Sequence, residues 1–337
     1  SSHPLRTLSK LAEISKLSGV AIADVAKVDA VTKANIANIN DLTIPSAGAF
    51  LLDTYTGASG AWSVRRLNTD YTGACMRVRR DSDDTEQDIG FDSNGDLDTA
   101  AIATFVGSGN NGYVRKWYGQ EASGGTGSGA DAENATASEQ PKIYNGTAVI
   151  TENGIPALDF DGSDDKLTYS FASGAPSTQG WQEDWAMFCA VAVDASGPVY
   201  TLQQGTSATT RFSQYYQVGN KIIWFRINPS PDILLNDSSN LVAGHYLLTT
   251  TSEFTSTTDR DHTAYRNGTL VATGNDTANY PDNSSSSYYY YNLLIGEQFV
   301  GQHLNGRMQE LVMYASDQTT NRTGIDSNIN SHFSIYT

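Results

Sequence analysis

The chain has 337 residues, with 37 acidic against 21 basic side chains and a formal net charge of −16 at neutral pH. A surface potential of this sign repels phosphate backbones and disfavours anionic membrane surfaces, so we expect no nucleic-acid partner. No run of the sequence is long and apolar enough to span a bilayer, so we expect no insertion into a membrane. Charged residues make up only 17% of the chain and there are 30 glycines, a composition typical of many strands joined by turns rather than of a helical bundle.

The first 46 residues carry an eleven-residue repeat. Apolar residues recur at this interval in two series three positions apart: Ile14, Val25 and Ile36, and Leu17, Val28 and Ile39. The period matches a helix of about 3.67 residues per turn, whereas the many β-branched residues also allow short strands and turns. A single apolar stripe on a thin segment cannot bury itself. We therefore predict an arm for oligomerisation or attachment over residues 1–46, with a helix packed on its own domain as the alternative.

From residue 50 the pattern changes to short strand-like runs separated by turns, as at 62–67, 74–79 and 113–118. Asp98 is positioned to cap a short helix that Gly107 ends. Residues 155–167 predict a strand, an Asp-Gly turn and a second strand, which together would form a hairpin. The two cysteines, Cys75 and Cys189, lie in apolar strand-like runs and are interpreted as small buried side chains, with a disulfide as the alternative.

The second half continues with strands. Residues 185–193 are apolar on both faces, as in a central strand, and Asn267-Gly268 predicts a type I′ hairpin. Ile325, Ile329 and Phe333 recur at a spacing of four, which predicts a short closing helix. Because strands and helices do not alternate, we expect two antiparallel sheets packed face to face over residues 47–337.

Several segments resemble the catalytic-domain fold of the α-L-arabinofuranosidase B family, which is similar to concanavalin A-like lectins and glucanases. The segments are AWSVRRLNTDYTGACMRVRRDSDDTEQDIGF, LDTAAIATFVG, VRKWYGQ and PALDFDGSDDKL. The C-terminal segments YRNGTLVATG and LLIGEQ resemble laminin-G-like domains. The resemblance implies an all-β fold: a concanavalin A-like jelly-roll β-sandwich with short helices.

A sandwich behind a repeat arm resembles structural proteins of tailed bacteriophages, particularly those of marine and cyanobacterial hosts. This implies a non-enzymatic virion protein, either a capsid decoration or a tail appendage, located on the capsid or tail surface. Its expected partners are other virion proteins, further copies of itself in a homo-oligomer, for which we expect a trimer, and a host-surface glycan. The alternative is a free carbohydrate-binding protein or an arabinofuranosidase-like glycoside hydrolase.

The expectation of a non-enzymatic protein depends on one region. In the arabinofuranosidase family the nucleophile is a Glu that follows an adjacent Cys pair, after the central strand. Here residues 196–216 contain neither a Cys pair nor a carboxylate, and Gln203 and Gln204 cannot act as nucleophiles. The five histidines show no metal-ligand spacing. We therefore predict no catalytic residues.

Aromatic side chains beside amides and carboxylates suit the apolar faces and hydroxyl groups of sugars. The candidates for carbohydrate binding are Trp117, Tyr118, Gln120, Tyr215, Tyr216, Trp224, Tyr288 and Tyr290, with packing in the core as the alternative for each. We expect no cofactor other than calcium, for which Asp92, Asn94 and Asp96 offer alternating oxygen ligands. The acidic residues between 159 and 165 are more simply interpreted as turn residues.

Overall fold

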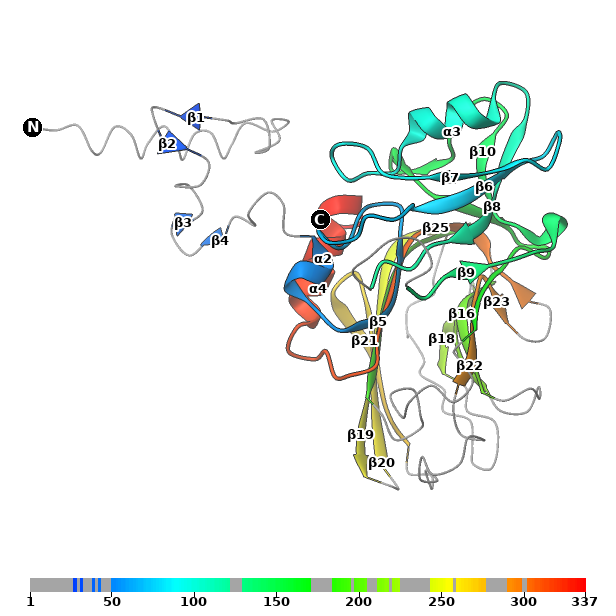
Figure 1. Cartoon of the computed structure of the whole chain (residues 1–337). Coiled ribbons are helices and arrows are strands. Elements are labelled where there is room, and N and C mark those ends of the chain that lie inside the picture. The colour runs from blue at the N-terminus through cyan, green and yellow to red at the C-terminus, as the bar shows by residue number, and fades with distance from the viewer. Residues whose placement is uncertain are drawn as a thin grey trace, which may run out of the picture. The chain divides into compact units, whose positions relative to one another are not determined.

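The computed structural model describes residues 50–121, 129–170, 184–194, 197–204, 211–217, 220–224, 243–256, 259–276, 290–298 and 302–337, together with four short strands nearer the N-terminus (Figure 1). The chain divides into two compact units, residues 1–49 and residues 50–337. The boundary expected from the sequence lies after residue 46.

Within the first unit the eleven-residue repeat forms short strands. β1 (Lys27–Val28) pairs with β2 (Val31–Thr32), and β3 (Asn38–Ile39) pairs with β4 (Leu42–Thr43), both antiparallel. Val28 lies opposite Val31 and, eleven residues later, Ile39 lies opposite Leu42. The repeat therefore favours the strand-and-turn interpretation at these positions. The other predicted arm residues, Ile14, Leu17, Val25 and Ile36, lie outside the described residues.

The second unit is an all-β sandwich, as predicted, and every strand pairing within it is antiparallel. Its first sheet has the strand order β21 (Thr269–Asp276), β20 (Asp259–Arg266), β19 (Gly244–Ser256), β15 (Trp185–Val193), β25 (Asn305–Tyr314) and β5 (Ala58–Ser63). Its second sheet has the order β9 (Ala132–Glu133), β14 (Leu167–Ser170), β22 (Tyr290–Ile295), β16 (Gly197–Gln204), β17 (Arg211–Gln217) and β18 (Asn220–Trp224).

A further group of strands joins these two sheets along one side. Its order is β7 (Glu86–Ile89), β6 (Met76–Arg80), β8 (Asn111–Trp117), β10 (Lys142–Asn145) and β13 (Leu158–Asp161). β13 pairs with β25 of the first sheet, and β8 pairs with β9 of the second. Two small ribbons complete the strands: β11 (Thr151–Glu152) with β12 (Ile155–Pro156), and β23 (Glu297–Gln298) with β24 (Gln302–His303).

The helices of the second unit are short: α2 (Leu51–Thr54), α3 (Thr99–Val106), the 3₁₀ helix η3 (Ala137–Glu139) and α4 (Arg322–Phe333). No helix among the described residues is long and apolar enough to cross a membrane. α3 begins at Asp98, whose carboxylate accepts a hydrogen bond from the Ala101 N–H at 2.8 Å, and ends at Gly107, as the sequence predicts.

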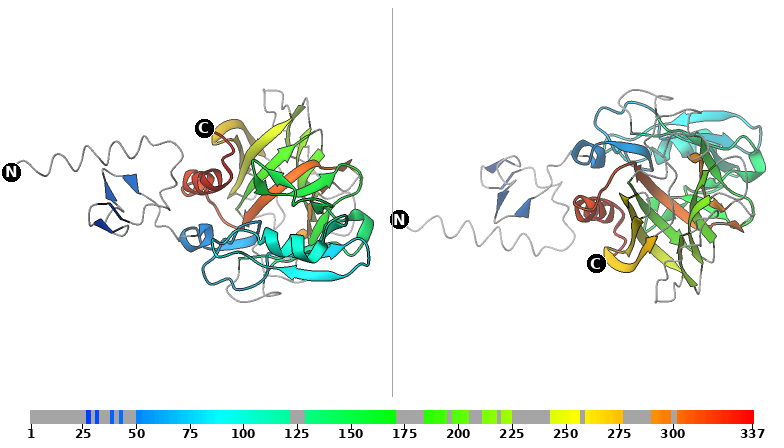
Figure 2. Two further views of the ribbon diagram at one scale, coloured as in Figure 1. Left: turned by 90° about the horizontal axis from the view of Figure 1, so that it is seen from above. Right: turned by 90° about the horizontal axis from the view of Figure 1, so that it is seen from below.

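Helix α4 explains why strand β15 is apolar on both faces. All nine residues of β15 are buried, and α4 lies against β15 and β19 on the side of the first sheet away from the second (Figure 2). The predicted stripe of Ile325, Ile329 and Phe333 is fully buried in this contact. Both predictions, of the central strand and of the closing helix, are confirmed.

Two other predictions from the sequence are confirmed. The type I′ turn joins β20 to β21, with Asn267 at φ 52° and Gly268 at φ 72°. Cys75 and Cys189 are both buried and unpaired, so the interpretation as small buried side chains holds and the disulfide does not.

The predicted hairpin over residues 155–167 is wrong. β13 and β14 do not pair with each other, because β13 pairs with β10 and β25 whereas β14 pairs with β9 and β22. The turn between them therefore leads from the joining group of strands into the second sheet. Gly162 makes this corner, because its φ is 79° and a Cβ atom there would lie 2.7 Å from the Cβ of Asn305.

A buried ion pair fastens the start of the sandwich to its central sheet. The Arg65 guanidinium donates two hydrogen bonds to the Glu310 carboxylate, at 2.7 and 2.9 Å, and the Ser63 hydroxyl donates a third at 2.7 Å. Glu310 lies in the middle of β25 and is fully buried. The Gln120 carboxamide binds the backbone of the same segment, accepting from the Leu67 N–H at 2.8 Å and donating to two carbonyl groups.

We predict that Glu310→Gln lowers the free energy of unfolding by about 3–5 kcal/mol, because it leaves the Arg65 charge buried without a countercharge. Urea denaturation measures this change. The matched control is Asp88→Asn, in the half-exposed Arg77–Asp88 pair, where we expect a loss below about 1 kcal/mol. Equal losses in the two variants would contradict a special role for the buried pair.

Candidate functional site

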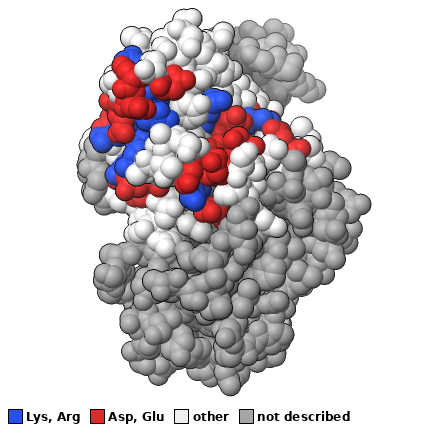
Figure 3. Space-filling model, turned by 90° about the vertical axis from the view of Figure 1, so that its right-hand side faces the viewer, with Lys and Arg blue, Asp and Glu red and all other residues white. Residues whose placement is uncertain are grey.

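A cavity of about 330 Å³ opens on the group of strands that joins the two sheets. Most of its lining is charged or polar: Arg79, Asp81, Tyr113, Ala137, Ser138, Lys142, Asp159, Asp161 and Asp165. The volume lies at the small end of the range for ligand sites, about 300–1,000 Å³. Acidic and basic side chains lie intermixed on the face of the molecule in Figure 3.

The floor of the cavity is one row of side chains across four strands. Arg79 on β6 lies opposite Tyr113 on β8, Tyr113 lies opposite Lys142 on β10, and Lys142 lies opposite Asp159 on β13. Residues directly opposite each other on paired strands point to the same face of a sheet. Strand pairing therefore gathers onto one surface four residues from distant parts of the sequence.

The row continues beyond the cavity to Arg307, opposite Asp159 on β25. Arg307 donates two hydrogen bonds to Asp194, at 2.7 and 2.8 Å, and one to Glu152 at 2.8 Å, and it lies 4.0 Å from Asp159. The Arg307 guanidinium is therefore hydrogen-bonded to two carboxylates and lies close to a third, that of Asp159 in the floor.

Arg79 is the fixed member of the row. Only 7% of the residue is exposed, and its guanidinium donates to Gln140 at 2.8 Å, to Asp84 at 2.8 Å and to the Ala137 carbonyl at 3.0 Å. It also lies over the Tyr113 ring, 5.0 Å from the ring centroid. These contacts tie the 3₁₀ helix η3 to the floor of the cavity.

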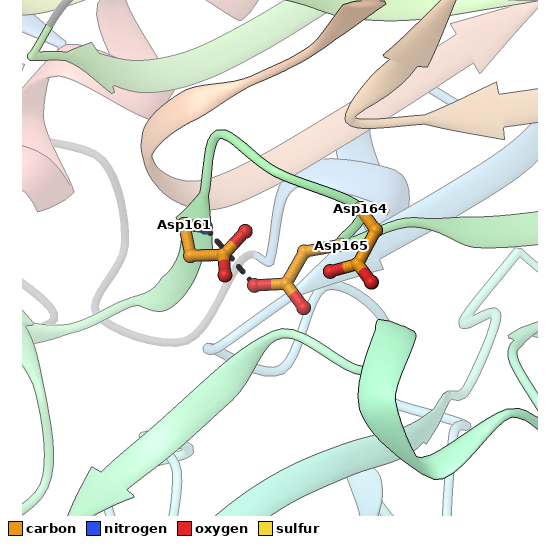
Figure 4. Close-up of side chains that lie close together, drawn as sticks. All are labelled: Asp161, Asp164 and Asp165. Carbon is orange, nitrogen blue, oxygen red and sulfur yellow. Dashed lines mark hydrogen bonds between the residues drawn. The ribbon is translucent and has the colours of Figure 1, made fainter. Parts of the chain in front are cut away.

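The acidic wall of the cavity comes from the corner between β13 and β14. β13 alternates Leu158 and Phe160 toward the core with Asp159 and Asp161 on the opposite face, so two carboxylates point outward. The corner then brings Asp165 back over Asp161, whose N–H donates to the Asp165 carboxylate at 3.0 Å (Figure 4).

The carboxylates of Asp161, Asp164 and Asp165 lie close together, with one oxygen atom from each within 4.8 Å of the others. Figure 4 shows the Asp161 and Asp165 carboxylates pointing toward one another. Asp161 is exposed, whereas only 6% of Asp165 is exposed. Burial, with three neighbouring aspartates, raises the pKa of Asp165 to about 7.

Two kinds of chemistry are open to this wall. A protonated carboxyl group beside an exposed carboxylate is the arrangement that general acid catalysis requires. Three carboxylates at this spacing are also suitable ligands for a hard cation such as calcium.

In the floor of the cavity, burial raises the pKa of the Asp159 carboxyl group, and the positive charges of Arg307 and Lys142 oppose this rise.

The structure places the first three predicted carbohydrate-binding residues in the interior. Trp117 and Gln120 are fully buried, and Tyr118 is 2% exposed, with its hydroxyl group donating to Asp88 at 2.8 Å. Their packing explains the VRKWYGQ segment without a ligand, which corrects the prediction for these three. The remaining candidates, Tyr215, Tyr216, Trp224, Tyr288 and Tyr290, have side chains outside the described residues.

The predicted calcium ligands are drawn into a turn. The Asp92 carboxylate accepts hydrogen bonds from the N–H groups of Asn94, at 2.8 Å, and Asp96, at 3.0 Å. This turn accounts for the spacing of Asp92, Asn94 and Asp96 without a cation. Calcium binding at these three residues stays a prediction.

Sequence reasoning missed the residues of the cavity floor. No motif joins Arg79, Tyr113 and Lys142, because only the pairing of β6, β8 and β10 brings them together. The alternation in Leu-Asp-Phe-Asp was the available signal for Asp159 and Asp161. The register also shifts between Lys142 and Tyr144, an irregularity of the kind that often lies beside functional sites.

Comparison with known proteins gives similarity in structure alone. No protein-family model matches the chain, and no curated protein matches its sequence. A GH54 α-L-arabinofuranosidase soaked with a cyclic sulfate inhibitor is similar with a TM-score of 0.56 and 16% identity, over 85% of this chain and 65% of that one. An arabinofuranosidase complexed with arabinofuranosyl-α-1,2-xylobiose has a TM-score of 0.57 and 17% identity, over 83% and 64%.

Trypanosoma rangeli sialidase is more distant, with a TM-score of 0.43, 12% identity and coverage of 65% of this chain and 31% of that one. The chain thus spans somewhat less than two thirds of the arabinofuranosidases, and what it shares with them is the sandwich fold. The expectation of a non-enzymatic protein is corrected here, because the arabinofuranosidases to which the chain is similar in structure are glycoside hydrolases. None of these comparisons concerns a bacteriophage protein.

We predict that Asp165 makes stability depend on pH. Its pKa is about 7 in the folded protein and 3.8 in its ordinary state, so between these values the folded state binds a proton that the unfolded state has lost. The stabilising contribution is complete below about pH 4 and is lost as the pH rises to about 7.

Asp165→Asn should remove this dependence, so the free energy of unfolding of the wild type, relative to the variant, should fall between pH 4.5 and pH 7.5. Urea denaturation across this range measures the difference. Asp70→Asn, at an exposed aspartate outside the cavity, serves as the control. A constant difference between the wild type and Asp165→Asn would refute the assignment.

Proposed function

We propose that the sandwich is a carbohydrate-active domain whose polar cavity binds a sugar and cleaves its glycosidic bond. The observation that carries this proposal is the pair formed by buried Asp165 and exposed Asp161 at the edge of the cavity. The fold shared with arabinofuranosidases supports it at the level of architecture.

The spacing of the pair fits a retaining mechanism. One oxygen of Asp161 lies within 4.8 Å of one of Asp165, an upper bound below the about 6.5–9.5 Å that inverting glycosidases keep between their carboxyl groups, whereas retaining glycosidases place the pair about 5–5.5 Å apart. Asp165, protonated up to about pH 7, gives its proton to the glycosidic oxygen as the leaving group departs. Asp161 attacks the anomeric carbon and forms a glycosyl ester. Asp165 then deprotonates a water molecule that hydrolyses this ester.

The proposal predicts hydrolysis of a 4-nitrophenyl glycoside that depends on both carboxyl groups. A panel of pentosides and hexosides in both anomeric forms is the assay, with release of nitrophenol as the readout. Asp165→Asn and Asp161→Asn should each lower kcat by at least about a hundredfold, the usual contribution of such a group.

Two results would distinguish hydrolysis by this protein from hydrolysis by a contaminating enzyme. Activity should fall above about pH 7 as Asp165 loses its proton. Asp70→Asn should retain full activity, because this exposed residue does not line the cavity. Equal activity in all three variants would refute the proposal. If sugars bind but are not cleaved, the domain would be a carbohydrate-binding domain and the proposed hydrolase activity would be refuted.

We propose separately that the N-terminal unit is an attachment or oligomerisation segment. The observation in its favour is the recurrence of two-residue strand pairs in the eleven-residue register. The two-residue strands offer little opportunity for self-burial, so further copies are the natural partners. Display on a bacteriophage particle, with other virion proteins as partners, stays a prediction from the sequence alone.

This second proposal predicts that the full chain is a defined oligomer, for which a trimer is expected, whereas a chain starting at residue 47 is a folded monomer. Light scattering after gel filtration gives both masses, and circular dichroism verifies that the shorter chain is folded. Identical monomeric masses would count against an assembly role for the segment.

A further inference from the structure

The strongest unused feature of the cavity is a lysine that forms no ion pair with any described residue. Lys142 lines the cavity, and no hydrogen bond or ion pair joins its ammonium group to any residue that the structure describes. Its neighbours are the Tyr113 ring, whose centroid lies 5.6 Å from Nζ, and Asp159, which it faces across the strand pair without an ion pair.

Other basic side chains on the surrounding strands behave differently. Arg77 pairs with Asp88 at 2.7 Å, Arg115 with Glu133 at 3.1 Å, and Lys116 with Glu133 at 3.3 Å. In a chain with 37 acidic residues, an ammonium group has many potential partners. Lys142 instead keeps its donors free within the cavity.

The floor around Lys142 adds two further donors. The Tyr113 hydroxyl group forms no hydrogen bond with any described residue. The Arg79 guanidinium, which carries five N–H groups, has a described bond from three of them. Lys142, Tyr113 and Arg79 therefore form a donor-rich stretch of the floor beside Asp159, while the wall carries the carboxyl groups of Asp161 and Asp165.

An ammonium group without an ion pair, beside a free hydroxyl group, suits a sugar with one acidic substituent. An ammonium group binds a carboxylate through short, charge-assisted hydrogen bonds, which are stronger than those to a neutral hydroxyl group. The wall repels the same carboxylate, so it excludes the orientation in which the acidic substituent points toward Asp161.

We infer that the cavity recognises a uronic acid, with Lys142 and Tyr113 binding the sugar carboxylate and the glycosidic bond turned toward Asp161 and Asp165. This inference rests on the proposed function for the location of the site. It assigns to Lys142 the role of a specificity-determining residue.

Binding of free sugars tests the inference independently of catalysis. Titration calorimetry compares glucuronic acid with glucose, and galacturonic acid with galactose, on the full chain. We expect the acid of at least one pair to bind at least tenfold more tightly than its neutral partner. Lys142→Met should abolish this preference, whereas Lys142→Arg should retain most of it.

The matched control is Lys166→Met. Lys166 forms ion pairs with Glu139 and Glu297 and does not line the cavity, so this variant should keep the preference. Circular dichroism confirms that each variant is folded. Equal affinities for acidic and neutral sugars, or a preference that survives Lys142→Met, would overturn the inference.

Hydrolysis of matched 4-nitrophenyl uronides and neutral glycosides separates the two proposals. If Asp165-dependent cleavage of neutral glycosides occurs without a preference for uronides, the proposed hydrolase activity is supported and the inference of uronic-acid recognition is overturned. If uronic acids bind through Lys142 but no glycoside is cleaved, the inference is supported and the proposed hydrolase activity is refuted. The absence of any sugar binding overturns both.

Discussion

The carboxylate of Glu310 is the constraint around which the sandwich is arranged. An ionised group in the middle of a buried strand is stable only with a charged partner and a full set of hydrogen bonds, and Arg65 and Ser63 supply them. β25, which carries Glu310, pairs with β5, β13 and β15. The ion pair therefore holds the first strand of the domain against the strand on which both the first sheet and the cavity depend.

The cavity forms because β13 and β14 do not pair with each other after the turn at Asp161. Had they formed a hairpin, the acidic residues of the turn would have stood in solvent at the tip. Crossing between the sheets folds the turn back over the strand ends and buries Asp165 beside Asp161. Desolvation then raises the pKa of Asp165 and leaves Asp161 at the surface, the difference on which the proposed roles of acid and nucleophile depend.

The local signals of the sequence predict the elements of this fold well. The Asp98 cap, the Asn267-Gly268 turn and the helix stripe at Ile325 each depend on a few adjacent residues, and the structure has all three. Local signals do not predict the site. The sequence of an Asp-Gly turn is the same whether the second strand pairs with the first or pairs with different strands. The row formed by Arg79, Tyr113 and Lys142 depends on the long-range pairing of three strands. The spacing of residues in the sequence does not predict which strands pair.

The cross-strand row has an evolutionary consequence. Each member of the cavity floor stands on a different strand, and backbone hydrogen bonds that are indifferent to side-chain identity fix its position. A single point mutation can therefore exchange one donor or charge of the floor while the path of the chain stays the same. A binding site built this way can diversify its ligands residue by residue, without the insertions and deletions through which loop-built sites change.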